Sequence, residues 1–267
     1  MKRKGILCHS PGRRTSKVNQ CLILAAGNGS RLLSASGGSP KPLVQLHGKS
    51  LLEHVILGAR EAGIERFVIV VGYCAAAMRQ WLEERRIGGV SVEMVDNDEY
   101  LKDNGVSVLK AREHLQGAFL LLMADHIFEP RTARTLLEEP LLPGEVILAV
   151  DPKTDRIFDL NDATKVRRDG DHIVDIGKEL ASYDAFDTGM FLCSPELFDV
   201  LESVKKNGNC SLSDGMRLLG QNGGLRAFDV EDASWQDVDT PEALAYAESI
   251  FSKQFCRTQS AEGLFSA

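Results

Sequence analysis

Short apolar runs alternate along the chain with amphipathic stretches, and this alternation restricts the fold more than any other feature. The runs have the length and composition of β-strands, and their apolar residues are continuous rather than alternating with polar ones. Parallel strands that are buried on both faces have this pattern. The sequence therefore predicts an α/β fold around a mostly parallel, twisted sheet. The strands are expected at 21–26, 67–71, 90–95, 118–123 and 145–150.

Helix start and stop signals lie between these runs. Ser50 is placed to cap a helix that continues through Ala62, with Glu53 at the capping-box position. Gly63 then ends that helix. Near the end of the chain, Thr240 precedes a proline at a first helical position. Further helices are expected at 75–86, 106–114, after residue 195 and at 212–219.

The pattern changes after residue 150. The segment 151–187 is rich in Asp and has no long helical periodicity, which indicates a small β-rich lobe. Within it, 166–168 and 172–176 form a predicted hairpin around Asp169-Gly170. Because the alternating pattern then resumes without a linker, we expect one domain over 20–252 that contains this lobe. The basic segment 1–19 and the segment 253–267 are expected to be tails, the first of them disordered.

Charge and apolar content exclude several classes of protein. The chain has 38 acidic against 31 basic residues, a formal charge of −7, which disfavours binding to nucleic acid. It has no run approaching the roughly 18 apolar residues of a membrane span. Six scattered cysteines show no metal-ligand spacing, which indicates reduced thiols. We therefore expect a cytoplasmic protein that binds small molecules.

A glycine-containing loop follows the first expected strand. Gly27-Asn28-Gly29-Ser30-Arg31 would let backbone N–H groups approach a polyphosphate, while Arg31 and Lys41 would add positive charge. The same loop is equally consistent with a plain strand-to-helix turn. It is not a dinucleotide-binding fingerprint, because Leu32 stands where a small residue is needed and no acid lies about 20 residues further on.

Acidic residues follow two other expected strands. Asp125 comes directly after the run 118–123, at the edge where open α/β sheets bind ligands. Asp237 and Asp239 lie in a second acidic stretch, 235–240. Carboxylate oxygens suit Mg²⁺ that bridges phosphates. Each of these residues has a structural alternative, since an Asp also caps turns and helices, and His126 is expected to be an ordinary loop histidine.

The stretch Leu24-Ala25-Ala26-Gly27-Asn28-Gly29-Ser30-Arg31-Leu32, followed by Lys41-Pro42-Leu43, resembles the motif of the nucleotidyltransferases that make activated sugars and alcohols. The resemblance implies a Rossmann-like fold of the nucleotidyltransferase type. It implies that the 27–31 loop wraps a triphosphate and that Lys41 stabilises charge on the α-phosphate. Asp237 matches the metal-binding acid of the family's W-x-D motif, so Mg²⁺ shared with Asp125 is implied. Whether Asp239 joins them or caps the next helix stays open.

Finer similarities point to the substrates. The stretch 103–107 resembles the K-x-N-G-x-S stretch of cytidylyltransferases, which implies base recognition by Ala25, Ala26, Asn104, Gly105 and Ser107; Asn104 and Ser107 are also ordinary helix-capping residue types. On the acceptor side, the family resemblance implies roles for Asp151, Lys178, Asp187, Thr188 and Gly189. Over about 21–247 the chain looks most similar to inositol-1-phosphate cytidylyltransferases.

The implied reaction is transfer of a cytidylyl group from CTP to a phosphorylated alcohol, with Mg²⁺ as cofactor and inositol 1-phosphate as the expected acceptor. The lobe carries many carboxylates, which accept hydrogen bonds from hydroxyl groups. The same carboxylates would attract phosphocholine or an aminoalkylphosphonate, and a sugar 1-phosphate is a further alternative. A non-catalytic nucleotide-sugar sensor and a glycosyltransferase remain as alternatives of other kinds. The sequence does not predict an oligomeric state.

Overall fold

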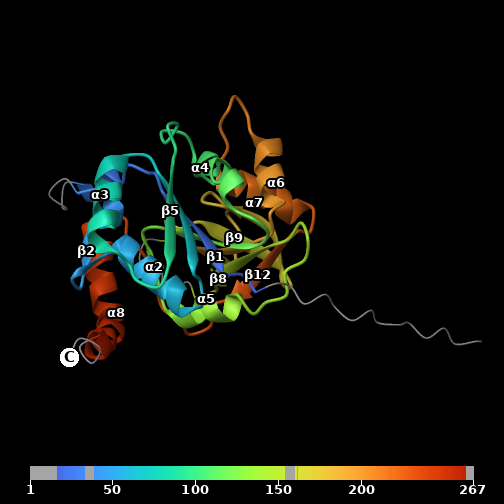
Figure 1. Cartoon of the computed structure of the whole chain (residues 1–267). Coiled ribbons are helices and arrows are strands. Elements are labelled where there is room, and N and C mark those ends of the chain that lie inside the picture. Colours follow the sequence, from blue (N-terminus) through green and yellow to red (C-terminus); the bar gives the residue numbers. More distant parts are fainter. Residues whose placement is uncertain (1–16, 34–38, 154–159, 161, 263–267) are drawn as a thin grey trace, which may run out of the picture.

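A nine-stranded sheet forms the centre of the molecule (Figure 1). The computed structural model describes residues 17–33, 39–153, 160 and 162–262. Residues 1–16 of the expected basic tail, residues 34–38, part of the lobe and residues 263–267 lie outside these ranges. In spatial order the strands are β5 (Ser91–Asp96), β4 (Arg66–Val71), β1 (Gln20–Ala25), β6 (Phe119–Met123), β11 (Ala185–Cys193), β8 (Val146–Asp151), β12 (Leu225–Asp229), β10 (His172–Gly177) and β9 (Lys165–Asp169).

The direction of the strands confirms the prediction of a mostly parallel sheet. Strands β5, β4, β1 and β6 are parallel neighbours. Strand β11 runs antiparallel to both β6 and β8, so β8 and its parallel neighbour β12 point the same way as β6. The β9–β10 hairpin is the one predicted around Asp169-Gly170, and it extends the same sheet at its edge. The carboxyl ends of β1 and β6 therefore meet at one edge.

Helices cover both faces of the sheet, because successive side chains of each strand point to opposite faces. Cys21 and Ile23 pack into one apolar cluster, and Leu22 and Leu24 pack into the other. The first cluster receives side chains from α2 (Leu51–Glu61), α3 (Ala75–Arg85), α5 (Pro130–Leu136) and α8 (Pro241–Glu262). The second receives side chains from α4 (Asn104–Lys110), α6 (Leu197–Val204) and α7 (Leu212–Gln221). Figure 1 shows α4, α6 and α7 together on one side.

Local signals placed most element boundaries within a few residues. The Ser50 hydroxyl accepts a hydrogen bond from the Glu53 backbone N–H at 3.2 Å, which confirms the predicted cap of α2. The second half of the capping box is absent, because the Glu53 carboxylate accepts from Arg85 at 2.7 Å instead. Strand β11 begins at Ala185, so the stretch 187–189 lies inside the strand and not at its start. Helix α8 continues past residue 252, where we expected the domain to end.

Several short elements were not predicted from the sequence. They are α1 (Ser30–Leu33), the 3-10 helix η1 (Lys41–Leu43), and the strands β2 (Gln45–Leu46), β3 (Lys49–Ser50) and β7 (His126–Phe128). The 3-10 helix η2 (Arg112–His114) is the end of the helix expected at 106–114, and the short strand β13 (Trp235–Asp237) lies in the acidic stretch 235–240. Strands β7 and β13 pair antiparallel, with Asp237 opposite His126. This pairing joins parts of the chain more than 100 residues apart. Among the described helices, none is long and apolar enough to cross a membrane.

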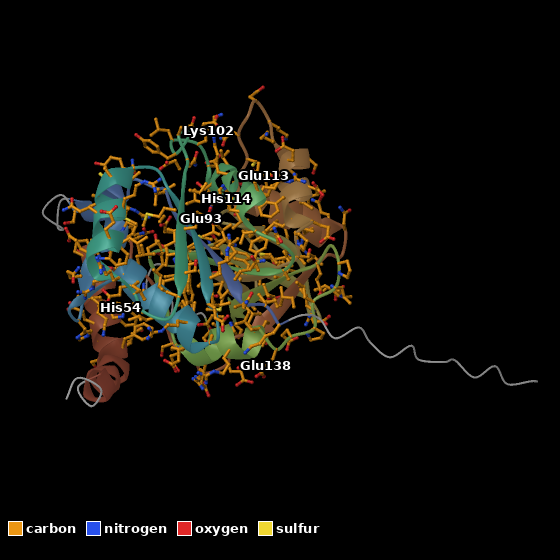
Figure 2. The ribbon with its side chains drawn as sticks, in the orientation of Figure 1. His54, Glu93, Lys102, Glu113, His114 and Glu138 are labelled. Carbon is orange, nitrogen blue, oxygen red and sulfur yellow. The ribbon has the colours of Figure 1, made fainter. Side chains whose placement is uncertain are left out.

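A group of charged side chains lies towards the amino ends of the parallel strands. Arg66 of β4 donates to Glu93 of β5 at 2.9 Å, and the Nδ1 atom of His114 lies 2.6 Å from the other Glu93 oxygen. Figure 2 shows Glu93 and His114 next to each other. We call Arg66, Glu93 and His114 the amino-end cluster. Each of these side chains is between 35% and 43% exposed, so the cluster is in contact with solvent.

Candidate active site

The glycine loop after β1 packs against Lys41. Gly29 has a φ of +54°, and a Cβ atom there would lie 2.4 Å from the Cβ of Lys41. Only glycine permits both this backbone conformation and this close approach. Together the loop and η1 form one side of a cavity of about 340 Å³, which we call the loop cavity. It is lined by Leu24, Ala25, Gly27, Asn28, Gly29, Arg31, Lys41, Pro42, Ala124, Asp125 and Asp239.

Lys41 is the cationic centre of the site. Its side chain is only 8% exposed, and its Nζ atom donates to Asp125 at 2.5 Å and also to Asp239. A third carboxylate, that of Asp237, lies 3.7 Å away. Burial alone would lower the pKa of Lys41, but the three carboxylates raise it well above its usual range. Lys41 therefore carries a fixed positive charge at any physiological pH.

Asp125, His126 and Asp237 converge across the short β7–β13 pair. One ligand atom from each lies within 4.8 Å of the others, close enough for one metal ion. The predicted proximity of Asp125 and Asp237 is thus confirmed. His126 donates from Nδ1 to Asp125 at 2.8 Å and lies in β7, not in a loop as expected. It also lines the site, and its place beside Asp125 and its resemblance to a family position were the sequence signals for this.

The charges of this group depend on each other. Burial would raise the pKa of Asp125, but Lys41 and His126 hold it well below its usual range. Burial raises the pKa of Asp237 to about 7, and the neighbouring Asp125 carboxylate adds to this effect. Burial opposes the charged form of His126, yet the carboxylates of Asp237 and Asp125 raise its pKa to about 9. Neighbouring cations therefore favour the ionised form of Asp125, whereas burial favours the protonated form of Asp237.

Asp239 is bound to the basic residues of the loop cavity. Its carboxylate accepts from Arg31 at 2.5 Å and from Lys41. The hydroxyl of Thr240, not Asp239, accepts from the Ala243 backbone N–H and so caps α8. Of the two alternatives for Asp239, the structure therefore excludes the helix cap.

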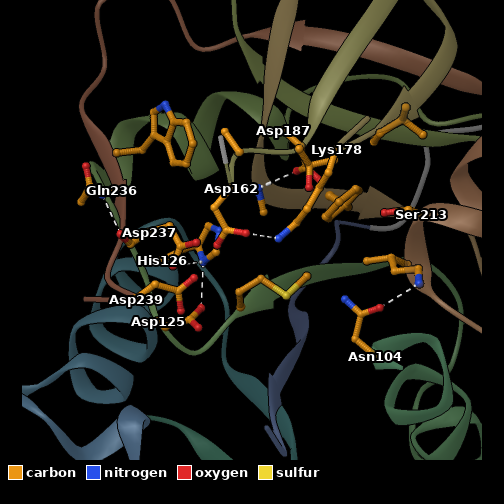
Figure 3. Close-up of a pocket in the computed structure, with 18 of the residues that line it drawn as sticks. Asn104, Asp125, His126, Asp162, Lys178, Asp187, Ser213, Gln236, Asp237 and Asp239 are labelled. Carbon is orange, nitrogen blue, oxygen red and sulfur yellow. Dashed lines mark hydrogen bonds and ion pairs between the residues drawn. The ribbon is translucent and has the colours of Figure 1, made fainter. Parts of the chain in front are cut away.

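A second cavity lies next to the loop cavity, between the β9–β10 hairpin, α7 and β13 (Figure 3). We call this space, of about 280 Å³, the hairpin cavity. Asp125 and Asp239 line both cavities, and among the described residues no others do. The hairpin cavity is lined by Asn104, Met123, Asp125, His126, Asp162, Ala163, Thr164, Ile176, Lys178, Asp187, Gly189, Phe191, Leu212, Ser213, Met216, Trp235, Gln236, Asp237, Asp239, Thr240 and Ala243.

Several predicted binding residues reach the hairpin cavity. Lys178 extends into it and contacts Asp162 at 2.5 Å, as the dashed line in Figure 3 shows. Asp187 is a partly buried wall residue, and desolvation raises its pKa to about 6. Asn104 also lines this cavity, and its side-chain oxygen accepts from the Leu212 backbone N–H at 2.8 Å. Asn104 therefore caps α7 and not its own helix.

Gly189 is required by its contact with His126. It has a φ of +75°, and a Cβ atom there would lie 2.5 Å from the His126 ring. Any side chain at this position would be strained and would push the ring away from Asp125. Gly189 thus sets the position of His126. This role requires only tight packing and no contact between Gly189 and the acceptor.

Other predicted site residues lie outside both cavities. Asp151, at the end of β8, is buried and accepts from the indole N–H of Trp235 at 2.9 Å. Thr188 donates to the Ala149 carbonyl at 2.8 Å. Ser107 accepts from Asn97 at 2.9 Å in a buried pair. Ala26 and Gly105 do not line either cavity, and the side chain of Ser30 lies outside the described part of the structure. Direct contact of these residues with a ligand stays a prediction, and the Asp151, Thr188 and Ser107 side chains have internal partners instead.

Asp162 lines the hairpin cavity, although we did not predict it as a site residue. The sequence indicated it as one of the many carboxylates of the lobe, and the stretch 162–166 also carried part of the family resemblance. Trp235, expected to serve in packing, lines the same cavity, and its ring stacks on His126 with 6.2 Å between centroids. The site therefore draws on parts of the chain from residue 24 to residue 243.

Comparisons with known proteins agree with this geometry. The chain is 36% identical over 230 residues to the bifunctional IPC transferase and DIPP synthase of Rubrobacter xylanophilus, covering 85% of this chain and 51% of that protein. It is 35% identical over 167 residues to the 2-aminoethylphosphonate cytidylyltransferase of Lancefieldella rimae, covering 60% and 63%. The chain spans about half the length of the first of these relatives.

A solved structure and a family model extend the comparison. The inositol-1-phosphate CTP transferase from T. maritima superposes with a TM-score of 0.78 at 27% identity, over 89% of this chain and 96% of that one. This similarity confirms the nucleotidyltransferase type of fold. The model of the MobA-like NTP transferase domain matches residues 21–221. The glycine loop, the buried lysine and the converging carboxylates thus lie in a chain that belongs to the family of MobA-like NTP transferase domains.

Proposed function

We propose that this protein transfers a cytidylyl group from CTP to inositol 1-phosphate and releases pyrophosphate. A phosphate oxygen of the acceptor would form a bond to the α-phosphorus of CTP, while the bond from that phosphorus to the β-phosphate oxygen breaks. The observation that carries the proposal is the meeting of two cavities at Asp125 and Asp239. A reaction between two bound phosphates needs such a junction.

The loop cavity suits the triphosphate. Backbone groups of 27–29 line it together with Arg31 and Lys41. Phosphoryl transfer is catalysed mainly by positioning and by neutralising the charge on the phosphate oxygens. Lys41, held at the junction, is placed to stabilise charge on the α-phosphate. This direct transfer requires no protein nucleophile.

The carboxylates at the junction suit Mg²⁺. The Oδ1 atom of Asp237 is buried, and no described group makes a hydrogen bond to it. A buried oxygen of this kind is costly unless a cation contacts it. Asp125 and Asp237 supply the hard oxygen ligands that Mg²⁺ prefers, and we propose that they hold it. The bound ion would neutralise phosphate charge as pyrophosphate leaves.

The hairpin cavity suits a phosphorylated polyol. Lys178 offers its ammonium group to the acceptor phosphate, and Asp187 offers oxygens to ring hydroxyls. Lys178 also disfavours a cationic headgroup in the space near it. The relatives named as an IPC transferase and an inositol-1-phosphate CTP transferase support the same acceptor. The similarity to a 2-aminoethylphosphonate cytidylyltransferase makes that phosphonate the acceptor to compare first.

A pyrophosphate-release assay tests the proposal. The protein is incubated with Mg²⁺, each of CTP, UTP, ATP and GTP, and inositol 1-phosphate, 2-aminoethylphosphonate, phosphocholine or glucose 1-phosphate. We expect the highest kcat/KM for CTP with inositol 1-phosphate. A value about tenfold below that of another acceptor, equal to about 1.4 kcal/mol of transition-state binding, would contradict the acceptor and leave the chemistry standing. Silence across the whole panel would contradict the enzyme assignment.

A further inference from the structure

The Asp162 carboxylate links the two cavities. One of its oxygens lies 2.8 Å from the guanidinium of Arg31, which lines the loop cavity. The other lies 2.5 Å from the ammonium of Lys178, which lines the hairpin cavity. Asp162 itself lines the hairpin cavity with 29% of its side chain exposed. It therefore bridges two cations that lie in different cavities.

This bridge occupies the Arg31 guanidinium and the Lys178 ammonium, the two cations that anionic ligands need. Arg31 is already shared between Asp162 and Asp239, both through the Nη2 atom. A phosphate that binds Arg31 places a second negative charge beside the Asp162 carboxylate, and the two repel each other at this distance. A phosphate that binds Lys178 meets the same carboxylate. Either ligand thus has to displace the same side chain.

We propose that Asp162 couples the binding of the two substrates, an inference that rests on the proposed function. While Asp162 bridges Arg31 and Lys178, it opposes both phosphates. The first substrate to bind displaces the carboxylate and leaves the cation of the other cavity available. The second substrate then binds without that cost. Coupling between two sites is reciprocal, so CTP and the acceptor each increase the affinity for the other by one common factor.

Calorimetric titrations of the full chain measure this factor. The ligands are inositol 1-phosphate and a CTP analogue with a methylene group between the α- and β-phosphorus, which cannot release pyrophosphate. Each Kd is measured in Mg²⁺, alone and with the other ligand saturating. We expect each ligand to lower the Kd of the other by the same factor, at least about fivefold, at the lower end of typical allosteric couplings.

The Asp162→Asn variant separates this role from direct contact with substrate. If Asp162 is the link, each ligand alone binds the variant more tightly than it binds the wild type, and the coupling factor falls to about 1. The Kd values in the ternary complex stay close to those of the wild type. If Asp162 instead held acceptor hydroxyls, the variant would bind inositol 1-phosphate more weakly, with and without the analogue.

Asp184→Asn is the matched control. Asp184 contacts Arg168 at 2.7 Å and lines neither cavity, so the substitution removes the same charge without touching the bridge. A general effect of net charge shifts binary and ternary affinities equally and preserves the coupling factor. We expect wild-type coupling in this variant.

Three results overturn the inference: wild-type coupling below about twofold, unchanged coupling in Asp162→Asn, or equal loss of coupling in Asp184→Asn. If inositol 1-phosphate does not bind at all, the acceptor assignment fails, and the coupling is measured with the acceptor that reacts in the turnover panel. If nothing reacts, the proposed function fails. The coupling factor is then measured with tripolyphosphate and inorganic phosphate, which carry only the anionic groups. This measurement decides whether Asp162 couples the two cavities.

Discussion

Two clusters of charged side chains lie at opposite ends of the same parallel strands. At the amino ends, Arg66, Glu93 and His114 pair with each other and are at least 35% exposed. At the carboxyl ends, Lys41 is 8% exposed, and the nearby Asp237 has a buried oxygen without a hydrogen-bond donor among the described residues. Solvent screens the first cluster, whereas burial strengthens the second. Charged side chains thus give a screened contact at one end and, under the proposed function, a site for Mg²⁺ and phosphates at the other.

Removal of the metal is the test of this comparison for which we expect the largest effect on the rate. Under the assay conditions with CTP and inositol 1-phosphate, a chelator should reduce pyrophosphate release to the detection limit. The reason is that the carboxylates of Asp125 and Asp237 then repel the triphosphate instead of holding a cation between them. Added Mg²⁺ should restore the full rate, and Mn²⁺ part of it. Undiminished turnover after removal of all divalent ions would refute the proposed metal role of Asp125 and Asp237.

Matched substitutions at the two ends should differ strongly. Asp125→Asn should reduce kcat/KM by at least about 100-fold, because it removes a charge that acts on the transition state. Glu93→Gln makes the same chemical change in the amino-end cluster and should leave kcat/KM within about twofold. Circular dichroism of both variants checks that they are folded. Comparable losses in the two variants would mean that both ends act through stability alone.

The two acids of the β13 region sharpen the assignment further. Asp237→Asn should raise the Mg²⁺ concentration needed for half-maximal rate by at least about tenfold, because it removes a proposed ligand. Asp239→Asn should change the rate without shifting this Mg²⁺ requirement, because Asp239 pairs with Arg31 and Lys41. Mg²⁺ titrations at several CTP concentrations separate the two effects. A normal Mg²⁺ requirement in Asp237→Asn, together with a shifted one in Asp239→Asn, would exchange their roles.

Glycine substitutions give a smaller effect that depends on position. Gly189→Ala and Gly170→Ala each place alanine at a positive φ, +75° and +65°, and each should lower the free energy of unfolding by more than about 1 kcal/mol. Only Gly189→Ala should also reduce kcat, by about tenfold to a hundredfold, because its Cβ displaces His126 at the site. Urea unfolding and turnover measure the two quantities. Equal turnover of both variants would show that the position of His126 does not matter.

The amino-end cluster itself should contribute least. Glu93→Gln weakens two exposed ion pairs, so we expect the free energy of unfolding to fall by about 0.2–1 kcal/mol. The measurement is urea unfolding at low and high salt, and the loss should shrink at high salt because exposed charges are screened. A salt-independent loss above about 2 kcal/mol would mean that this cluster is not the screened surface contact described above.

Local sequence signals predicted most of the sheet and of the loop cavity. Apolar runs located the long strands, and the end of such a run located Asp125. The sequence also gives the direction of each strand, because the residues that follow an apolar run lie at the carboxyl end of that strand. Because the carboxyl ends of β1 and β6 share an edge, the loop carrying Gly29 and the residue Asp125 were predicted to meet.

The rest of the site depends on contacts that leave no periodic signal. Strands β7 and β13 have three residues each, too few for a pattern, and they pair across more than 100 residues. Their pairing brings His126 to Asp237. The family resemblance implied acceptor roles for both Asp151 and Asp187, yet one is bound to an indole and the other lines a cavity.

The wall shared by the two cavities has a consequence for how such a chain can diversify. Only Asp125 and Asp239 line both cavities among the described residues. Residues such as Ile176, Ser213 and Met216 line the hairpin cavity alone. Under the proposed function, substitutions there can reshape the space for the acceptor while the groups proposed to act on the triphosphate stay in place. The acceptor can then change during evolution without any change in the residues that bind the triphosphate.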